Sequence, residues 1–132
     1  HYSEKDREFW REKEWKGIDP EAVYSTSVHS VEGYNDLPEH FSYAFLSPVF
    51  DSISKPGYTS VSFDLSKRKQ GGCSLIALGG IQATNVQQAI EQGFDGVALL
   101  GAIWHSENPV ETIQISSDAI NRTTTKQYLK IT

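Results

Sequence analysis

Hydroxyl side chains and a lysine follow an apolar run near the middle of this chain. Residues 42–50, SYAFLSPVF, are mostly apolar or aromatic, and Ser52, Ser54 and Lys55 come soon after them. A lysine ammonium is a compact positive charge and a serine hydroxyl donates a hydrogen bond, so this set suits an anionic ligand. Each charge-assisted hydrogen bond contributes about 1.5–3 kcal/mol. The stretch is therefore a candidate phosphate-binding segment.

Three further segments place polar side chains or accessible backbone groups where apolar runs end. The residues concerned are Ser27, His29, Gly79, Gly80, Leu100 and Gly101. Paired glycines leave backbone N–H groups open to an approaching anion. Each segment alone has a plainer interpretation, since a GG pair is commonly a turn, a lysine is commonly solvated and a histidine can cap a helix. Together, at the ends of successive strands, they predict a phosphate site.

Strands and helices are expected to alternate along the chain. The expected strands are 21–30, 42–50, 73–81 and 95–104, and the expected helices are 3–15, 84–94 and 108–121, with a helical turn or two within 31–40. Ser3, Thr84 and Asn108 are the predicted caps at the starts of helices, and Gly93 is the glycine predicted to end the helix before it. Residues 59–70 fit either element. Strands this apolar, separated by helices, predict a parallel sheet covered on both faces.

Four strands spaced by about 20–30 residues correspond to half of a parallel α/β barrel of the (β/α)₈, or TIM, type. Such barrels carry their sites at the carboxyl ends of the strands, where the polar clusters fall. The chain begins with His1-Tyr2 and contains no methionine, so we expect residues 1–132 to form one domain, the C-terminal half of a longer barrel. The open strand edges of a half barrel also indicate missing partners. A self-sufficient flavodoxin-like sheet is the structural alternative.

Composition narrows the range of partners. The formal net charge is −5, which disfavours non-specific attraction to nucleic acid or anionic lipid. No apolar run approaches the roughly 20 residues of a membrane span, and no signal-peptide pattern opens the chain. Cys73 is the single cysteine, so no internal disulfide forms. We expect a cytoplasmic protein whose partners are small molecules, with no nucleic acid and no membrane, and with homodimerisation left open.

Four segments resemble a known family in their order and spacing. They are STSVHS, SPVFDSISKPGY, ALGGIQATNV and GFDGVALLGAIW, within residues 22–104. They resemble segments of the thiamine-phosphate synthase and thiazole tautomerase (TenI-type) superfamily. The resemblance implies a (β/α)₈ barrel of the thiamine-phosphate synthase type that binds 4-methyl-5-(2-hydroxyethyl)thiazole phosphate. It also implies that His1-Tyr2 ends the preceding strand.

The resemblance implies that the hydroxyls and the lysine after the second strand hold phosphate. Lys55, with Ser52 or Ser54, matches the family's contacts to phosphate and pyrophosphate in a TxTK segment. Both threonines of that segment are serines here. This departure keeps the hydroxyls and loses only methyl groups, so the implied contacts stand.

The resemblance also implies a cradle for the thiazole phosphate. Gly79 and Gly80, with the backbone of Leu100 and Gly101, match the family's residues there. Gly101 stands where the family has serine, so a hydroxyl contact is lost while the backbone N–H remains. Ser47 replaces a glycine of the family, and nothing in the sequence explains that change.

Ser27 and His29 match family residues with more distinctive roles. Ser27 matches a serine near the pyrophosphate or the metal of the synthases, and His29 matches the acid/base of the tautomerases. A histidine at that position also occurs in synthases. Mg²⁺ is implied as a cofactor, with its acidic ligands and the pyrimidine site expected in the first half of the barrel, so the metal ligands within this chain are unknown.

The sequence is compatible with three functions. The first is a transferase that joins hydroxymethylpyrimidine diphosphate to the thiazole phosphate with release of pyrophosphate, in which Lys55 neutralises the leaving group. The second is a thiazole tautomerase, an isomerase in which His29 moves the proton. The third is a non-catalytic protein that binds the thiazole phosphate.

Overall fold

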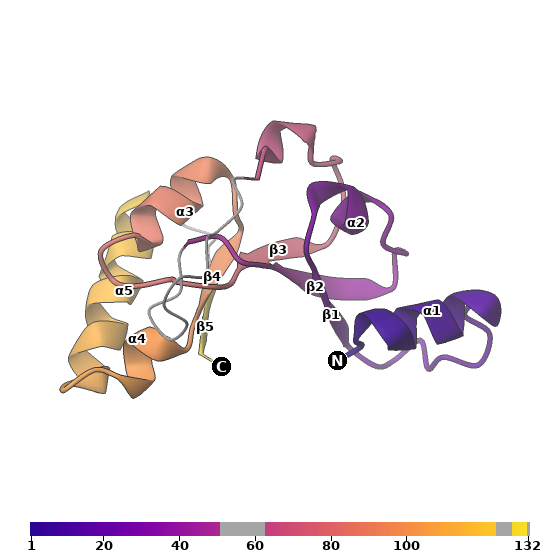
Figure 1. Ribbon diagram of the computed structural model, residues 1–132, viewed down its shortest axis with the longest axis horizontal. Coiled ribbons are helices and arrows are strands. Elements are labelled where there is room, and N and C mark those ends of the chain that lie inside the picture. The colour runs from indigo at the N-terminus through magenta and orange to yellow at the C-terminus, as the bar shows by residue number, and fades with distance from the viewer. Residues whose placement is uncertain (51–62, 124–127, 132) are drawn as a thin grey trace.

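The computed structural model describes residues 1–50, 63–123 and 128–131 of the chain (Figure 1). The elements are α1 (Glu4–Glu12), β1 (Tyr24–Val28), α2 (Val31–Asn35), β2 (Phe41–Leu46), the 3₁₀ helix η1 (Leu65–Lys67), β3 (Ser74–Ala77), α3 (Val86–Gln92), β4 (Gly96–Leu99), α4 (Gly101–Trp104), α5 (Pro109–Thr123) and β5 (Tyr128–Ile131). Within these ranges, no helix is both long and apolar enough to cross a membrane.

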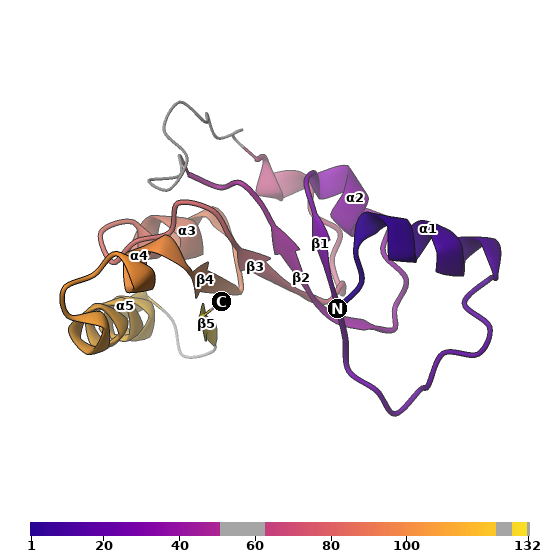
Figure 2. The same ribbon diagram turned by 60° about the horizontal axis from the view of Figure 1, so that its bottom comes forward.

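The strands form one parallel sheet in the order β1-β2-β3-β4-β5. Each strand pairs with the next one along the chain, which is how the wall of a parallel barrel is built. The strands lie side by side, with α3 and α5 beside β4 and with α1 beyond β1 (Figure 2). The sequence therefore predicted the α/β class and the parallel sheet correctly.

The two faces of the sheet differ in what covers them. Alternate strand residues, including Val28, Leu46 and Ala77, pack in one core with residues of α2, α3 and α5. The residues between them share the opposite face, because side chains alternate along a strand. In register across that face lie Ser27 and Phe45, which are both partly exposed. This second face is the one that a closed barrel would enclose.

Helix caps visible in the sequence account for several element boundaries. Ser3 and Asp6 form a capping box, with the Asp6 N–H donating to Ser3 Oγ at 3.2 Å. Gly93 has φ +113°, the left-handed conformation that ends α3. The Glu111 N–H donates to Asn108 Oδ1 at 3.2 Å at the start of α5. These three boundaries confirm the sequence predictions.

Other boundaries correct the predictions. The helix predicted from Thr84 begins at Val86, with Asn85 in the cap position. The strand predicted over 95–104 ends at Leu99, and residues 101–104 form α4. A short apolar run does not tell strand from helix, which explains that error. The last helix extends to Thr123, and β5 was not predicted.

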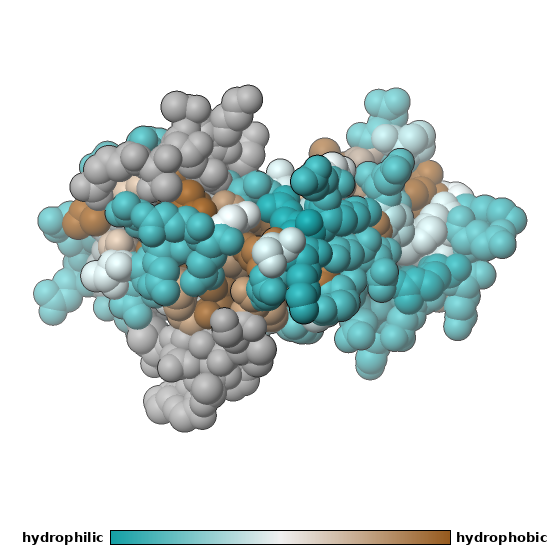
Figure 3. All heavy atoms as spheres, turned by 90° about the horizontal axis from the view of Figure 1, so that it is seen from above, coloured by the Kyte–Doolittle hydropathy of each residue, from teal (hydrophilic) through white to brown (hydrophobic). Residues whose placement is uncertain are grey.

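Aromatic rings fasten α1 and its turn to the amino end of the sheet. The Tyr2 ring lies 6.4 Å from Trp10 and 6.5 Å from Trp15, and Trp15 lies 4.6 Å from His40. Otherwise α1 is charged and has no buried residue, so hydrophilic side chains cover that end of the molecule (Figure 3). These aromatic contacts, together with hydrogen bonds from Arg7 to β1, hold α1 in place without burial of a helix face.

Candidate functional site

Hydrogen bonds between loops join the carboxyl ends of β1, β2 and β3. The Ser47 N–H donates to Val28 O at 3.3 Å, which links the ends of β1 and β2. The Val49 N–H donates to Leu78 O at 3.0 Å, and the Phe50 N–H donates to Gly79 O at 3.0 Å. The segments that follow β1, β2 and β3 are therefore joined at this end of the sheet, as far as Phe50, the last described residue before the predicted cluster of Ser52, Ser54 and Lys55.

Gly79 is required by close packing as well as by backbone conformation. Its φ is +97°, and a Cβ built on it would lie 2.9 Å from Pro48 Cα. A side chain here would push the loop after β2 away from the loop after β3. Gly79 therefore allows the close approach of the loops after β2 and β3 at the predicted phosphate site.

Asn85 fixes the loop that follows Gly79. Its Nδ2 donates to Gly80 O at 2.9 Å, and its Oδ1 accepts from the Gln82 N–H at 2.8 Å. Gly80 itself has φ +65°. Sequence analysis missed Asn85, although an asparagine five residues after a glycine pair and before a helix is a recognisable loop-closing signal.

Leu100 and Gly101 follow β4, the neighbour of β3. Because β3 and β4 are parallel and paired, these residues and Gly80 follow adjacent strands at the same end of the sheet. The Leu100 side chain is 49% exposed, and Gly101 opens α4. The first N–H groups of a helix have no acceptor within it, so this backbone has donors to offer at the predicted cradle.

His29 is exposed, and its ring is oriented by the loop after β2. Its Nδ1 lies 3.1 Å from Ser47 O. A carbonyl oxygen can only accept, so Nδ1 carries the proton in this bond. In the neutral ring Nε2 then has a free lone pair, which is what an acid/base needs.

Ser27 lies on the inner face near the end of β1, within reach of a histidine that sequence analysis did not assign to the site. Ser27 Oγ lies 3.3 Å from His1 Nε2, and His1 Nδ1 lies 3.0 Å from Ser25 Oγ. His1 and Ser27 are 26 positions apart in sequence. No spacing rule could have paired them, because only the fold brings them together.

Arg7 supports the same strand from α1. Its Nη1 donates to Thr26 Oγ1 at 2.5 Å and to Ser27 O at 2.6 Å. Burial lowers the pKa of Arg7, although a guanidinium stays charged at any physiological pH. Arg7 therefore holds the backbone that presents Ser27.

Ser52, Ser54 and Lys55 lie outside the described residues. Phe50 is the last described residue before them, and it bonds to Gly79 at the candidate site. Their assignment to the phosphate site continues to rest on the sequence.

Residues that could hold Mg²⁺ do not gather in the described part of the chain. In residues 1–50, 63–123 and 128–131, no group of three or more His, Cys, Asp or Glu side chains is placed to bind a metal ion. The chain's described residues therefore do not form a Mg²⁺ site by themselves.

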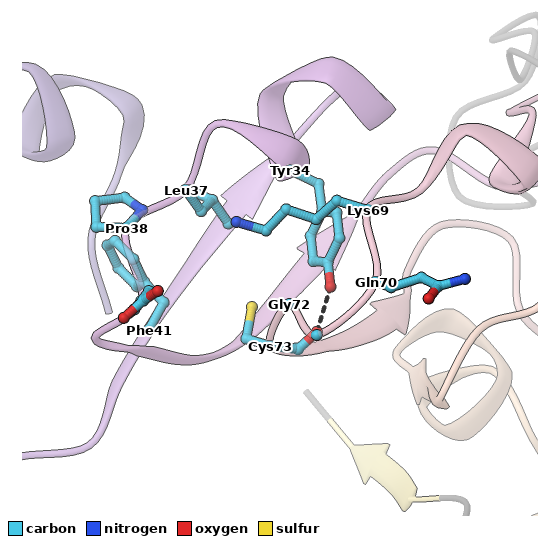
Figure 4. A pocket seen from close by; sticks show the side chains of 10 residues that line it. Tyr34, Leu37, Pro38, Phe41, Lys69, Gln70, Gly72 and Cys73 are labelled. Atoms are coloured by element: carbon cyan, nitrogen blue, oxygen red, sulfur yellow. Dashed lines mark hydrogen bonds between the residues drawn. The ribbon is translucent and has the colours of Figure 1, made fainter.

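A pocket of about 490 Å³ lies at the amino ends of β2 and β3, opposite the candidate site (Figure 4). Phe41, Lys69 and Cys73 are among the residues that line it. Tyr34 OH donates to Cys73 O at its wall, and burial raises the pKa of the Cys73 thiol. At neutral pH a thiol with a raised pKa is mostly protonated and is a poor nucleophile. The presence of Cys73 therefore does not indicate that this pocket is a catalytic site.

Comparisons with known proteins agree with the fold and with the strand-end loops. The model of the thiamine monophosphate synthase family matches residues 10–103. Thiamine-phosphate synthase 1 of Streptococcus pneumoniae (strain ATCC BAA-255 / R6) is 27% identical over 106 residues, which cover 75% of this chain and 50% of that protein. Thiamine-phosphate synthase of Thermosynechococcus vestitus is 32% identical over 92 residues, covering 68% of this chain and 26% of that protein.

Solved structures show the same architecture. Thiamine phosphate pyrophosphorylase from Pyrococcus furiosus superposes with a TM-score of 0.70 at 18% identity, covering 94% of this chain and 59% of that one. The corresponding protein from Bacteroides thetaiotaomicron gives a TM-score of 0.58 at 22% identity, covering 83% and 58%. The sheet, its helices and its strand-end loops thus define an α/β protein that forms part of a thiamine-phosphate-synthase-type barrel. The chain belongs to the thiamine monophosphate synthase family.

The chain spans about half the length of the first curated relatives it matches. Those relatives are named as thiamine-phosphate synthases, so the family is one of enzymes of thiamine biosynthesis.

Proposed function

We propose that this chain supplies the thiazole-phosphate and pyrophosphate side of a thiamine-phosphate synthase active site. The observation that carries the proposal is the joining of the loops after β1, β2 and β3, beside the loop after β4, in a chain whose residues 10–103 match that family. The same end of a barrel sheet is where such enzymes bind their substrates.

The proposed reaction joins two substrates without a protein nucleophile. The thiazole nitrogen attacks the methylene carbon of hydroxymethylpyrimidine diphosphate, the carbon–oxygen bond breaks, and its electron pair leaves with pyrophosphate. Lys55, with Ser52 or Ser54, would neutralise the leaving group. The backbone at Gly80 and Gly101 would hold the thiazole phosphate. Positioning and charge stabilisation of this kind are sufficient to accelerate such a displacement.

Several finer statements belong to the same proposal. Residues 1–132 would be a single domain, the C-terminal half of the barrel. Mg²⁺ would be the cofactor, with its ligands and the pyrimidine site contributed by the first half of the barrel. The protein would be cytoplasmic and would act on phosphorylated small molecules, as a monomer or as a homodimer.

A thiazole tautomerase is the second candidate, and one observation favours it. The bond from His29 Nδ1 to Ser47 O leaves Nε2 of the neutral ring free to accept a proton. A positioned histidine of this kind typically contributes about 10²–10⁴-fold to a proton transfer.

The test follows product formation by the intact protein. The protein is supplied with Mg²⁺, thiazole phosphate and hydroxymethylpyrimidine diphosphate, and thiamine phosphate is detected after oxidation to a fluorescent product. We expect product, and we expect Lys55→Ala to weaken thiazole-phosphate or pyrophosphate binding by about 1.5–3 kcal/mol, the size of one charge-assisted bond.

Lys69→Ala is the matched control, because Lys69 lines the pocket at the opposite end of the sheet. It should leave binding and product unchanged. Product from wild type with equal effects of the two substitutions would remove Lys55 from the site. If no thiamine phosphate forms but a thiazole carboxylate tautomer is converted in a reaction that depends on His29, the isomerase is established. If neither reaction is detected, a non-catalytic binding protein is the remaining candidate.

A further inference from the structure

The His1 imidazole bridges two serine hydroxyls on the inner face of the sheet. His1 Nδ1 lies 3.0 Å from Ser25 Oγ, and His1 Nε2 lies 3.3 Å from Ser27 Oγ. The two serines are two positions apart on β1, so their side chains share one face. The Tyr2 N–H donates to Ser25 O at 2.8 Å, which fixes the backbone that carries His1. Its ring also lies 6.0 Å from that of Phe45, across the register from Ser27.

The burial of Ser25 decides which nitrogen of His1 carries the proton. Ser25 is 7% exposed, and within the described residues its hydroxyl is in hydrogen-bond contact with His1 Nδ1. A buried hydroxyl proton needs an acceptor, because leaving it unpaired is costly. Ser25 therefore donates to Nδ1, and the proton of the neutral imidazole sits on Nε2.

The direction of these bonds then fixes the hydroxyl of Ser27. With the proton on Nε2, His1 donates to Ser27 Oγ, so the Ser27 O–H cannot be used on His1 and is free to be donated elsewhere. In the opposite tautomer, Nε2 would accept a hydrogen bond from the Ser27 O–H, and only the lone pairs of Ser27 Oγ would remain for a ligand. A free O–H suits an anionic oxygen, whereas lone pairs alone would suit a metal ion.

We propose that His1 is a positioning residue that, held by Ser25, directs the Ser27 O–H toward a phosphate-type oxygen of the ligand. The proposal rests on the proposed function and on the family resemblance, which places Ser27 near the pyrophosphate or the metal. Of these two ligands, the proposal selects the anion. His1 acts through Ser27 and makes no contact with the reacting atoms.

The first test reads the tautomer directly. Histidine-selective ¹⁵N labelling of the intact protein, with the His1 signals assigned by their loss in His1→Gln, distinguishes a protonated from an unprotonated ring nitrogen. We expect Nε2–H in the free protein and in the presence of inorganic pyrophosphate. Ser25→Ala should let the two tautomers mix. A predominant Nδ1–H tautomer in the wild type would overturn the proposal.

The second test measures the affinity for inorganic pyrophosphate by calorimetry. We expect Ser27→Ala and His1→Ala each to weaken binding by roughly tenfold, the effect of about one hydrogen bond. The double variant should bind no more weakly than Ser27→Ala, because both substitutions remove one interaction. His1→Gln, which keeps a donor near the Nε2 position, should restore most of the affinity. Ser42→Ala, an exposed serine on β2, is the matched control and should change nothing.

The outcomes separate this inference from the proposed function. Formation of thiamine phosphate with additive losses in the double variant, or with no effect of His1→Ala, overturns the role of His1 alone. Absence of any pyrophosphate binding, together with absence of thiamine phosphate, overturns both.

Discussion

At the scale of single residues, Gly79 tests whether loop packing shapes the site. A Cβ at this position meets Pro48 Cα at 2.9 Å in a backbone of φ +97°. Because strain in such a conformation costs about 1–3 kcal/mol, we expect Gly79→Ala to lower the free energy of unfolding by at least that much. Urea unfolding measures it. Gly17→Ala is the control, since φ is +89° there and no described atom lies within 4 Å of the added Cβ. An equal loss of unfolding free energy in the two variants would show that the contact with Pro48 adds nothing to the cost of the backbone conformation.

His29 can be separated into two functions by substitution. Its Nδ1 orients the ring against Ser47 O, and its Nε2 is the group available for proton transfer. We expect His29→Ala to reduce tautomerisation by about 10²–10⁴-fold while phosphate binding stays nearly intact. His29→Asn keeps a donor for Ser47 O and lacks the base, so it should lose the same activity. A collapse of phosphate binding in both variants would instead make His29 a ligand contact or a structural residue.

At the scale of elements, an ion pair joins the amino end of β3 to the start of β4. Arg68 Nη2 lies 2.5 Å from Asp95 Oδ2, which also accepts the Leu75 N–H at 2.8 Å. Burial lowers the pKa of Arg68, but the hydrogen bonds with Asp95 and Tyr34 outweigh it and raise the pKa overall. The pair therefore links a loop to the backbone of two strands, and it lies at the end of the sheet away from the candidate site.

Asp95→Ala should lower the free energy of unfolding by about 1.5–3 kcal/mol, because it leaves a partly buried guanidinium and a strand N–H without this acceptor. Chemical denaturation measures the change. The exposed pair of Lys16 and Glu14, with side chains 79% and 74% exposed, gives the control. Lys16→Ala should alter the free energy by less than about 0.5 kcal/mol. Similar effects of the two substitutions would show that the Arg68 pair is no more than a surface contact.

The elements that sequence could predict are those with local signals. Ser3, Gly93 and Asn108 mark helix boundaries through contacts within a few residues, so their patterns are readable. β5 follows a polar stretch and is stabilised by pairing with β4, a tertiary contact that no local pattern encodes. The bond from His1 to Ser27 and the pair of Arg68 with Asp95 span 26 and 27 positions. The helix boundaries were therefore predictable from local signals, whereas these long-range contacts were not, and the assignment of residues to the phosphate site stays a prediction.

At the scale of the whole molecule, the two ends of the sheet differ in character. The carboxyl end carries exposed polar groups on loops tied by backbone bonds. The amino end of β1 and β2 carries the aromatic cluster of Tyr2, Trp15, Tyr24, His40 and Phe41. Because the cluster joins the turn after α1 to β1 and β2, it contributes to the stability of the fold, and none of its members is a predicted site residue. Substitutions within it should change unfolding and leave ligand contacts unchanged.

His40 makes that cluster sensitive to pH. Burial lowers the pKa of its imidazole, and its buried Nε2 has no hydrogen-bond partner within the described residues. The unfolded chain, with an ordinary pKa of about 6.5, then binds more protons than the folded one on acidification. Stability from this residue is therefore fully present above about pH 6.5 and is lost as the pH falls through the lower pKa of the folded state.

We expect the free energy of unfolding, measured in urea, to fall between pH 7 and pH 5 in the wild type. His40→Phe removes the titrating imidazole and keeps an aromatic ring among Trp15, Tyr24 and Phe41. The free energy of unfolding of this variant should therefore fall less over the same pH interval. The comparison cancels the carboxylates that titrate in both proteins. An equal fall in the two proteins would mean that the folded state holds the charged imidazole as readily as water does. The surrounding rings would then stabilise the cation through their faces, and burial would not be the dominant effect.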